Sequence, residues 1–113
     1  MISIDIAQAG GLLEAKRIAD LAYIFNIPVT THNMNGPVAT IASANAAAAM
    51  ADFLGHETSD YKRGDPPVES LITYDREIIQ DGHIQLSDKP GLGMDINKDV
   101  ATKYLMEGEE WWG

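Results

Sequence analysis

The sequence contains no cysteine, and this absence excludes several kinds of chemistry at once. A chain without thiols forms no disulfide bonds, binds no metal through thiolates and uses no cysteine nucleophile. It also lacks any run of about 18 apolar residues, and its start does not show the basic-then-apolar order of a signal peptide. We therefore expect a soluble, cytoplasmic protein with no membrane partner.

Basic residues are scarce as well, since 8 Lys and Arg stand against 17 Asp and Glu, for a net charge of −9. Such a chain gains nothing from a nucleic-acid backbone or an anionic membrane surface, because it has little positive charge to neutralise them. We expect no nucleic acid as a partner. With 113 residues and 45% hydrophobic content, the chain can form one domain or part of one.

The first half of the chain alternates β-type segments with helical ones. Apolar and polar residues alternate at the start, whereas from Leu12 to Phe25 apolar residues recur at spacings of three and four, which predicts an amphipathic helix ended by Asn26. This alternation favours an α/β fold with parallel strands. The expected elements are a strand over 1–7, helix 12–25, strand 27–31, an Ala-rich helix 38–51 and a strand over 53–57.

The second half has a different character, with more loop and turn signals. Asp81-Gly82 lies between two apolar segments, and this dipeptide readily forms the type I′ turn of a β-hairpin. We expect the Trp111-Trp112 pair in the acidic tail to pack against a partner surface. The other expected elements are a loop over 58–69, a hairpin over 78–86, a strand over 94–96 and a helix over 98–105 capped by Asn97.

Three ionisable residues, Asp5, His32 and Glu57, each lie at the end of an expected strand. Parallel α/β folds collect their chemistry at these ends, and neighbouring strands lie about 4.8 Å apart. A carboxylate on one imidazole nitrogen fixes the tautomer and leaves the other nitrogen to move a proton. Asp5 and His32 therefore form a candidate acid/base dyad, and Glu57, if protonated, is a candidate hydrogen-bond donor to an oxyanion.

Each of these residues also has an ordinary structural interpretation. Asp5 could form a turn, His32 could cap a helix or lie on the surface, and Glu57 could be a loop acid. The residues alone leave both interpretations open. We expect the other two histidines, His56 and His83, to face solvent, and for His56 the alternative is a supporting place behind the site residues.

Several motifs resemble the enolase superfamily. Asp5 followed by Gly10-Gly11 and a helix with Glu14-Ala15 and Ile18-Ala19 resembles the segment around the sixth barrel strand. The run from His32 to Val38 resembles the end of the seventh strand in the mandelate racemase/muconate lactonizing enzyme branch, most closely its acid-sugar (galactonate-type) dehydratases. Glu57 after Phe53-Leu54 resembles the acid of the eighth strand, and residues 81–93 are similar to the closing hairpin and Pro-Gly-Leu-Gly segment.

The resemblance implies the C-terminal part of a TIM-like (β/α)₇β barrel followed by a hairpin and a tail. Residues 1–57 would be the last βα units, and 58–113 the closing loop, hairpin and C-terminal segment of one incomplete domain. The implied reaction is Mg²⁺-dependent abstraction of the proton α to a carboxylate, followed by loss of water from a small sugar acid. Asp5 and His32 match the dyad, and Glu57 matches the acid that binds the substrate carboxylate.

A complete barrel takes about 250 residues, and the family's Mg²⁺ ligands and opposing base lie upstream of the motifs found here. We therefore expect a C-terminal fragment from a truncated gene or protein, inactive alone and with no metal ligand of its own. Two alternatives stay open. One is a racemase or epimerase of the same superfamily, and the other is a non-catalytic fragment that self-associates into a homo-oligomer through its uncovered sheet edge and Ala-rich helix.

Overall fold

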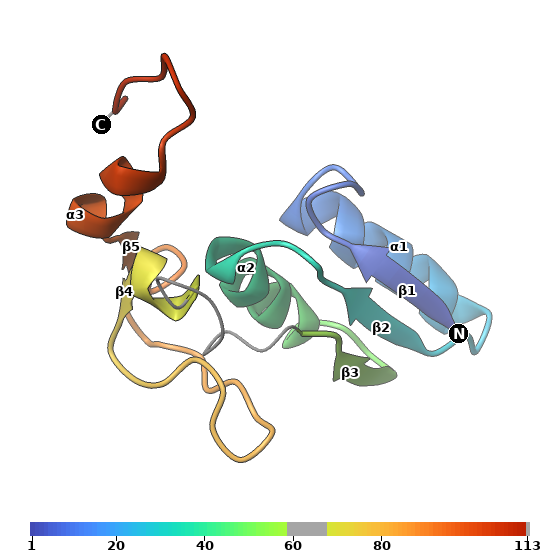
Figure 1. Ribbon diagram of the computed structural model, residues 1–113. Coiled ribbons are helices and arrows are strands. Elements are labelled where there is room, and N and C mark those ends of the chain that lie inside the picture. Colours follow the sequence, from blue (N-terminus) through green and yellow to red (C-terminus); the bar gives the residue numbers. More distant parts are fainter. Residues whose placement is uncertain (59–67, 113) are drawn as a thin grey trace.

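The computed structural model describes residues 1–58 and 68–112, and its first half alternates strands and helices as predicted (Figure 1). The strands of the second half form a separate small sheet. The elements are β1 (Ile2–Asp5), α1 (Leu12–Ile24), β2 (Val29–His32), α2 (Pro37–Ala47), β3 (Phe53–His56), a 3₁₀ helix (Val68–Leu71), β4 (Ile72–Tyr74), β5 (Met94–Ile96), α3 (Lys98–Ala101) and a second 3₁₀ helix (Thr102–Tyr104).

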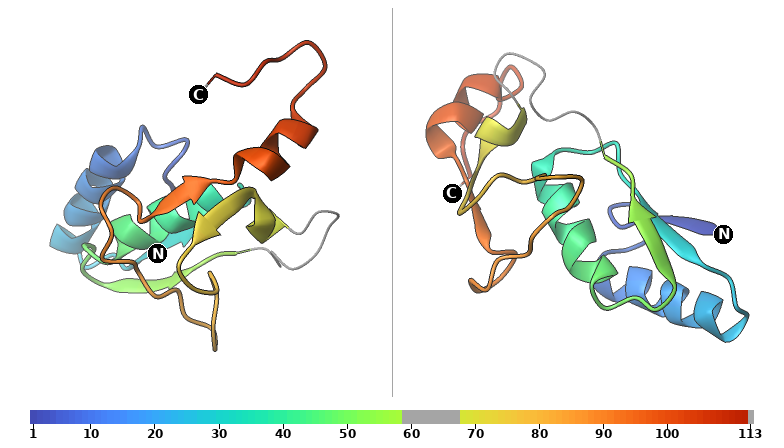
Figure 2. Two further views of the ribbon diagram at one scale, coloured as in Figure 1. Left: turned by 90° about the vertical axis from the view of Figure 1, so that its left-hand side faces the viewer. Right: turned by 90° about the horizontal axis from the view of Figure 1, so that it is seen from below.

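The main sheet has the order β1-β2-β3, and both neighbouring pairs are parallel, as predicted. Both α1 and α2 lie on one face of this sheet (Figure 2). The alanines of α1 that face the sheet are fully buried, and their small size lets the helix approach closely. The core on this face contains Ile4, Ile6, Ala15, Ala19, Ala22, Val29, Ala46 and Met50.

The end of α1 follows from Asn26, which has the left-handed φ of 53°. Its N–H donates to the carbonyl of Tyr23, and the N–H of Ile27 donates to that of Ala22, each at 3.0 Å. These two bonds form a Schellman motif, which satisfies carbonyls that the helix leaves open. The predicted cap at Asn26 is confirmed, and the chain turns directly into β2.

The Ala-rich helix α2 ends at Ala47, four residues before its predicted end at Ala51. The N–H of Ala49 bonds the carbonyl of Ala46, and that of Met50 bonds Ala47, so the helix tightens into 3₁₀-type turns. Asp52 then takes a positive φ of 52°, which leads the chain into β3. Alanine content predicts where a helix forms better than where it stops.

The predicted hairpin is correct in its turn and wrong in its length. Asp81 and Gly82 have φ values of 50° and 74°, as a type I′ turn requires, and Gln80 and His83 exchange both backbone bonds. The ladder stops at this single bridge. Ile78 explains the stop, because it is buried in a second hydrophobic cluster rather than paired with a strand.

That second cluster joins α2 to the small sheet. Its buried residues are Ile41 on α2, Ile72 on β4 and Ile78. The strand β4 was not predicted, and it pairs antiparallel with the predicted strand β5. Its three residues are too few to show a periodic pattern, so only the contact with β5 defines it.

The C-terminal helix begins after Asn97, as predicted, but Asn97 caps it with its backbone carbonyl rather than with its side chain. The carbonyl of Asn97 accepts the N–H of Ala101 at 2.8 Å, and no side-chain capping bond forms. The rings of Trp111 and Trp112 stack with centroids 4.8 Å apart, and Lys98 lies over the Trp111 ring. Packing of this pair against a partner stays a prediction.

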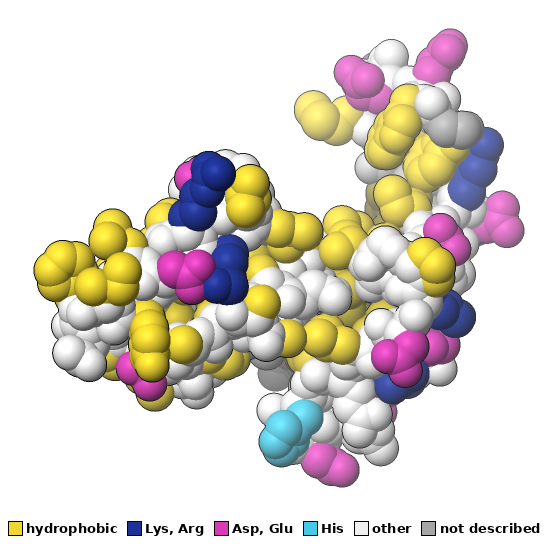
Figure 3. All heavy atoms as spheres, turned by 180° about the vertical axis from the view of Figure 1, so that it is seen from behind, with side chains coloured by type: hydrophobic (Ala, Val, Ile, Leu, Met, Phe, Trp, Pro, Cys, Tyr) yellow, Lys and Arg dark blue, Asp and Glu magenta, His cyan; other side chains and the backbone are white. Residues whose placement is uncertain are grey.

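The outer surface of helix α1 carries exposed apolar side chains beside its charged ones. Figure 3 shows hydrophobic side chains over this part of the molecule. The exposed ones on and just after α1 are Leu12, Leu13, Leu21, Tyr23, Ile24 and Phe25. The homo-oligomer predicted through the uncovered sheet edge and the Ala-rich helix stays a prediction. Among the described residues, no helix has the length and apolar character needed to cross a membrane.

Candidate active site

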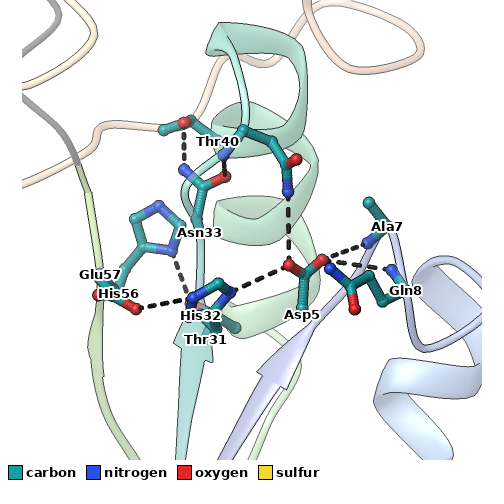
Figure 4. A network of polar contacts seen from close by, with 10 residues as sticks. Asp5, Ala7, Gln8, Thr31, His32, Asn33, Thr40, His56 and Glu57 are labelled. Carbon is teal, nitrogen blue, oxygen red and sulfur yellow. Dashed lines mark hydrogen bonds and ion pairs between the residues drawn. The ribbon is translucent and has the colours of Figure 1, made fainter.

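Asp5 and His32 are the last residues of β1 and β2 and stand opposite each other in the parallel register. Nδ1 of His32 lies 3.0 Å from Oδ2 of Asp5 (Figure 4). An ionised carboxylate only accepts hydrogen bonds, so the proton of this contact belongs to Nδ1. The predicted meeting of the two side chains is confirmed, and Nε2 of His32 is the nitrogen directed away from Asp5.

Asp5 is held by a full set of donors. Its Oδ1 accepts the N–H groups of Ala7 at 2.9 Å and Gln8 at 3.3 Å, and Oδ2 also accepts Nδ2 of Asn35 at 3.4 Å. The hydrogen bond from His32, followed by those from the backbone, lowers the pKa of the Asp5 carboxyl below its ordinary value, although desolvation opposes the shift. Asp5 therefore stays ionised and orients the imidazole.

This arrangement makes a prediction about the tautomer of His32. In Asp5→Asn, the backbone N–H groups of Ala7 and Gln8 still need an acceptor, so the amide oxygen takes the place of Oδ1 and faces them. The amide NH₂ group then takes the place of Oδ2 and faces His32. Nδ1 must then accept, and we expect ¹⁵N NMR at alkaline pH to show the proton moved from Nδ1 to Nε2. The exposed Asp20→Asn serves as the control and should keep the original tautomer. An unchanged His32 tautomer in Asp5→Asn would contradict the orienting role of Asp5.

Glu57 follows β3 and joins the same group of side chains. Its N–H donates to the carbonyl of Thr31 at 2.9 Å, and its Oε2 lies 3.7 Å from Nε2 of His32. This distance suits an ion pair and is too long for a direct hydrogen bond. The structure thus brings the three predicted site residues together, with the imidazole between two carboxyl groups (Figure 4). Their catalytic roles stay a prediction.

The loop after β2 contributes residues that the sequence analysis missed. Asn33 is buried, its Nδ2 donates to Oγ1 of Thr40 at 2.6 Å, and its Oδ1 accepts the N–H of Asn35 at 3.2 Å. This folds the loop back so that Asn35 reaches Asp5. The signal was available, because Asn residues after a strand readily form such side-chain turns.

His56 does not face solvent, contrary to the prediction. Its ring is half-buried, and Nδ1 lies 2.6 Å from Oγ1 of Thr31. Burial lowers the pKa of His56, against a smaller opposing effect of Glu57. Nε2 is buried without a hydrogen-bond partner among residues 1–58 and 68–112. Strand alternation was the missed signal, since neighbours His56 and Glu57 must point to opposite faces. His83 is exposed, as predicted.

The lowered pKa of His56 predicts a loss of stability in mild acid. The unfolded chain takes up this proton near the ordinary pKa of 6.5, before the folded chain does, so the free energy of unfolding falls as the pH drops below that value. Urea unfolding between about pH 7 and pH 5 should show a smaller fall for His56→Gln than for the wild type. The exposed His83→Gln should keep the wild-type dependence, and equal falls in all three would refute the prediction.

The described residues do not fit a resident magnesium ion. Among them, no three His, Asp or Glu side chains form a group that could hold a metal. Mg²⁺ requires oxygen ligands in near-octahedral geometry, whereas Asp5 and Glu57 are placed about the His32 ring.

A parallel sheet with an acid and an imidazole at adjacent strand ends is typical of α/β enzymes with their chemistry at the carboxyl edge. Residues 1–100 match the family described as Enolase C-terminal domain-like, and the chain belongs to this family. The predicted superfamily is thereby confirmed.

Curated relatives carry dehydratase names. The chain is similar to the D-xylonate dehydratase of Haloferax volcanii, with 39% identity over 109 residues that cover 96% of this chain and 26% of that protein. It is also similar to the D-gluconate/D-galactonate dehydratase of Picrophilus torridus, with 32% identity over 97% of this chain and 27% of the relative. The chain thus spans about a quarter of these relatives' length.

Solved structures agree with the fold. A mandelate racemase/muconate lactonizing enzyme-like protein from Rubrobacter xylanophilus superposes with a TM-score of 0.88 and 38% identity, over 98% of this chain and 28% of that one. A structure from Burkholderia described as a putative mandelate racemase/muconate lactonizing enzyme gives a TM-score of 0.83 at 32% identity, over 97% of this chain and 27% of that one. The α/β fold with a parallel sheet is that of this family.

Proposed function

We propose that this chain is the C-terminal catalytic segment of an acid-sugar dehydratase, and that Asp5, His32 and Glu57 are its part of the active site. The 3.0 Å contact between Asp5 and His32 carries the proposal, because it joins an ionised orienting acid to a proton-transferring ring. The dehydratase names of the relatives support the substrate class. Residues 1–57 would supply the last βα units of a barrel, and 58–113 its closing segment.

In this proposal, the reaction removes the proton α to the substrate carboxylate and expels the β-hydroxyl as water. A base from the rest of the enzyme takes the α-proton. The His32 imidazolium donates its Nε2 proton to the leaving hydroxyl and keeps its Nδ1 proton, which stays hydrogen-bonded to the Asp5 carboxylate. The resulting enol becomes a 2-keto-3-deoxy acid when a proton is added to the β-carbon and the enol hydroxyl gives up its proton to water. Glu57, in its protonated form, donates a hydrogen bond to the substrate carboxylate, whose charge grows as the α-proton leaves.

Magnesium, which enolase-superfamily enzymes typically use, would be bound by residues outside this chain. It would stabilise the charge that develops on the substrate carboxylate. We therefore expect the isolated 113-residue chain to be inactive toward sugar acids even with Mg²⁺ present. Turnover at a normal enzymatic rate by the isolated chain would refute this part of the proposal.

A chimaeric enzyme tests the function directly. This chain replaces the segment that it matches in the Haloferax volcanii D-xylonate dehydratase, and the chimaera is assayed on a panel of aldonates. Formation of a 2-keto-3-deoxy acid is the expected result. Inversion at the α-carbon without loss of water would favour the racemase alternative instead. A folded chimaera with neither activity would refute an enzymatic role for the chain.

A further inference from the structure

Strand β3 is out of regular register with β2 by one residue. Val29 pairs with Phe53, but the next residue, Thr30, pairs with Gly55, so Leu54 has no partner in the ladder. The side chain of Leu54 is 64% exposed, as expected for a residue pushed out of the pairing. Compared with uninterrupted pairing, such a bulge places every later side chain of the strand on the opposite face of the sheet.

This shift decides which side chain of β3 meets His32. With regular pairing, His56 would stand opposite His32, and Glu57 would point to the face that the helices cover. With the bulge, His56 stands opposite Thr31. Glu57 then follows on the face of His32, where its Oε2 lies 3.7 Å from Nε2.

A side-chain pair on the helix-covered face fits only the shifted register. Oγ1 of Thr31 lies 2.6 Å from Nδ1 of His56, and Thr31 is fully buried. The carbonyl of Thr31 also accepts the N–H of Glu57 at 2.9 Å. In the regular register Gly55 would stand opposite Thr31, and it has no side chain to bond the hydroxyl. The buried hydroxyl would then lose its partner, which is costly.

We propose that the Thr31–His56 pair fixes the shifted register and so positions Glu57 beside His32. Neither member of the pair touches the reacting atoms, so both are positioning residues. The effect of the pair on the register is a property of this chain. Its consequence for catalysis rests on the proposed function.

NMR on the 113-residue chain tests the register through the amide that donates to the Thr31 carbonyl. In the shifted register this amide is Glu57, and in the regular one it is His56. Thr31→Val removes the hydroxyl at nearly constant volume. In this variant the scalar coupling through the hydrogen bond from the Glu57 N–H to the residue 31 carbonyl should disappear, and hydrogen exchange of the Glu57 amide should be about tenfold faster. Thr31→Ser keeps the hydroxyl, and Thr30→Val alters the neighbouring residue. Both variants should keep the wild-type coupling and the wild-type exchange rate at Glu57.

A Thr31→Val chain with wild-type coupling and exchange at Glu57 would overturn the proposal. If that variant does not fold, His56→Leu decides in its place, since it removes the same contact and keeps an apolar side chain. In the chimaera, kcat/KM should fall about tenfold in Thr31→Val and recover in Thr31→Ser. An inactive wild-type chimaera would count against the proposed function and leave the NMR result intact, whereas an active one unaffected by Thr31→Val would refute the positioning role.

Discussion

Replacing His32 by Asn in the chimaera is expected to lower kcat for dehydration by about 10²- to 10⁴-fold, the usual contribution of a positioned acid or base. Asn can still donate a hydrogen bond toward Asp5, so the strand ends keep their contact. It cannot deliver a proton to a leaving hydroxyl near neutral pH. The measurement is steady-state formation of the 2-keto-3-deoxy acid at saturating substrate.

The matched control is His83→Asn, which changes an exposed histidine in the turn after β4. It should retain kcat within about twofold, as expected for a surface substitution away from the site. Circular dichroism of both variants verifies that each is folded. If His32→Asn keeps wild-type kcat, the dyad is structural and the proposed mechanism fails.

Ile41→Ala is expected to have the largest effect on stability, a loss of about 2–4 kcal/mol in the free energy of unfolding. Ile41 is fully buried on α2 and packs in one cluster with Ile72 and Ile78. Truncation of the Ile41 side chain leaves a cavity between α2 and the small sheet formed by β4 and β5. Urea unfolding followed by circular dichroism measures the loss.

Ile24→Ala makes the same chemical change on the exposed surface of α1, where the side chain is 71% exposed. We expect its free energy of unfolding to differ from the wild type by no more than about 0.5 kcal/mol. A similar loss in both variants would show that burial in the second cluster does not stabilise the chain as described.

Local patterns were enough to predict the order of strands and helices in the first half of the chain. The spacing of apolar residues in α1 and the cap at Asn26 are properties of neighbouring residues, and both are confirmed. The meeting of Asp5 and His32 could also be predicted, because one helix joins two parallel strands and brings their ends level.

Three features that sequence reasoning missed depend on contacts between distant segments: strand β4, the short ladder after Ile78 and the bulge in β3. Strand β4 exists through its pairing with β5, and the short ladder at Gln80 ends because Ile78 turns into a core shared with α2. The bulge at Leu54 likewise depends on contacts with another segment, strand β2. Its position is visible only from the register with β2, and without it His56 rather than Glu57 would be expected beside His32.

The most direct test of the account uses a sugar acid in which fluoride replaces the β-hydroxyl. Fluoride departs without a proton, so it needs no general acid. In the chimaera, His32→Asn should lose elimination of water by about 10²-fold or more and keep elimination of fluoride within about tenfold of the unsubstituted chimaera. Equal loss of both reactions, or of neither, would contradict the claim that His32 donates the proton.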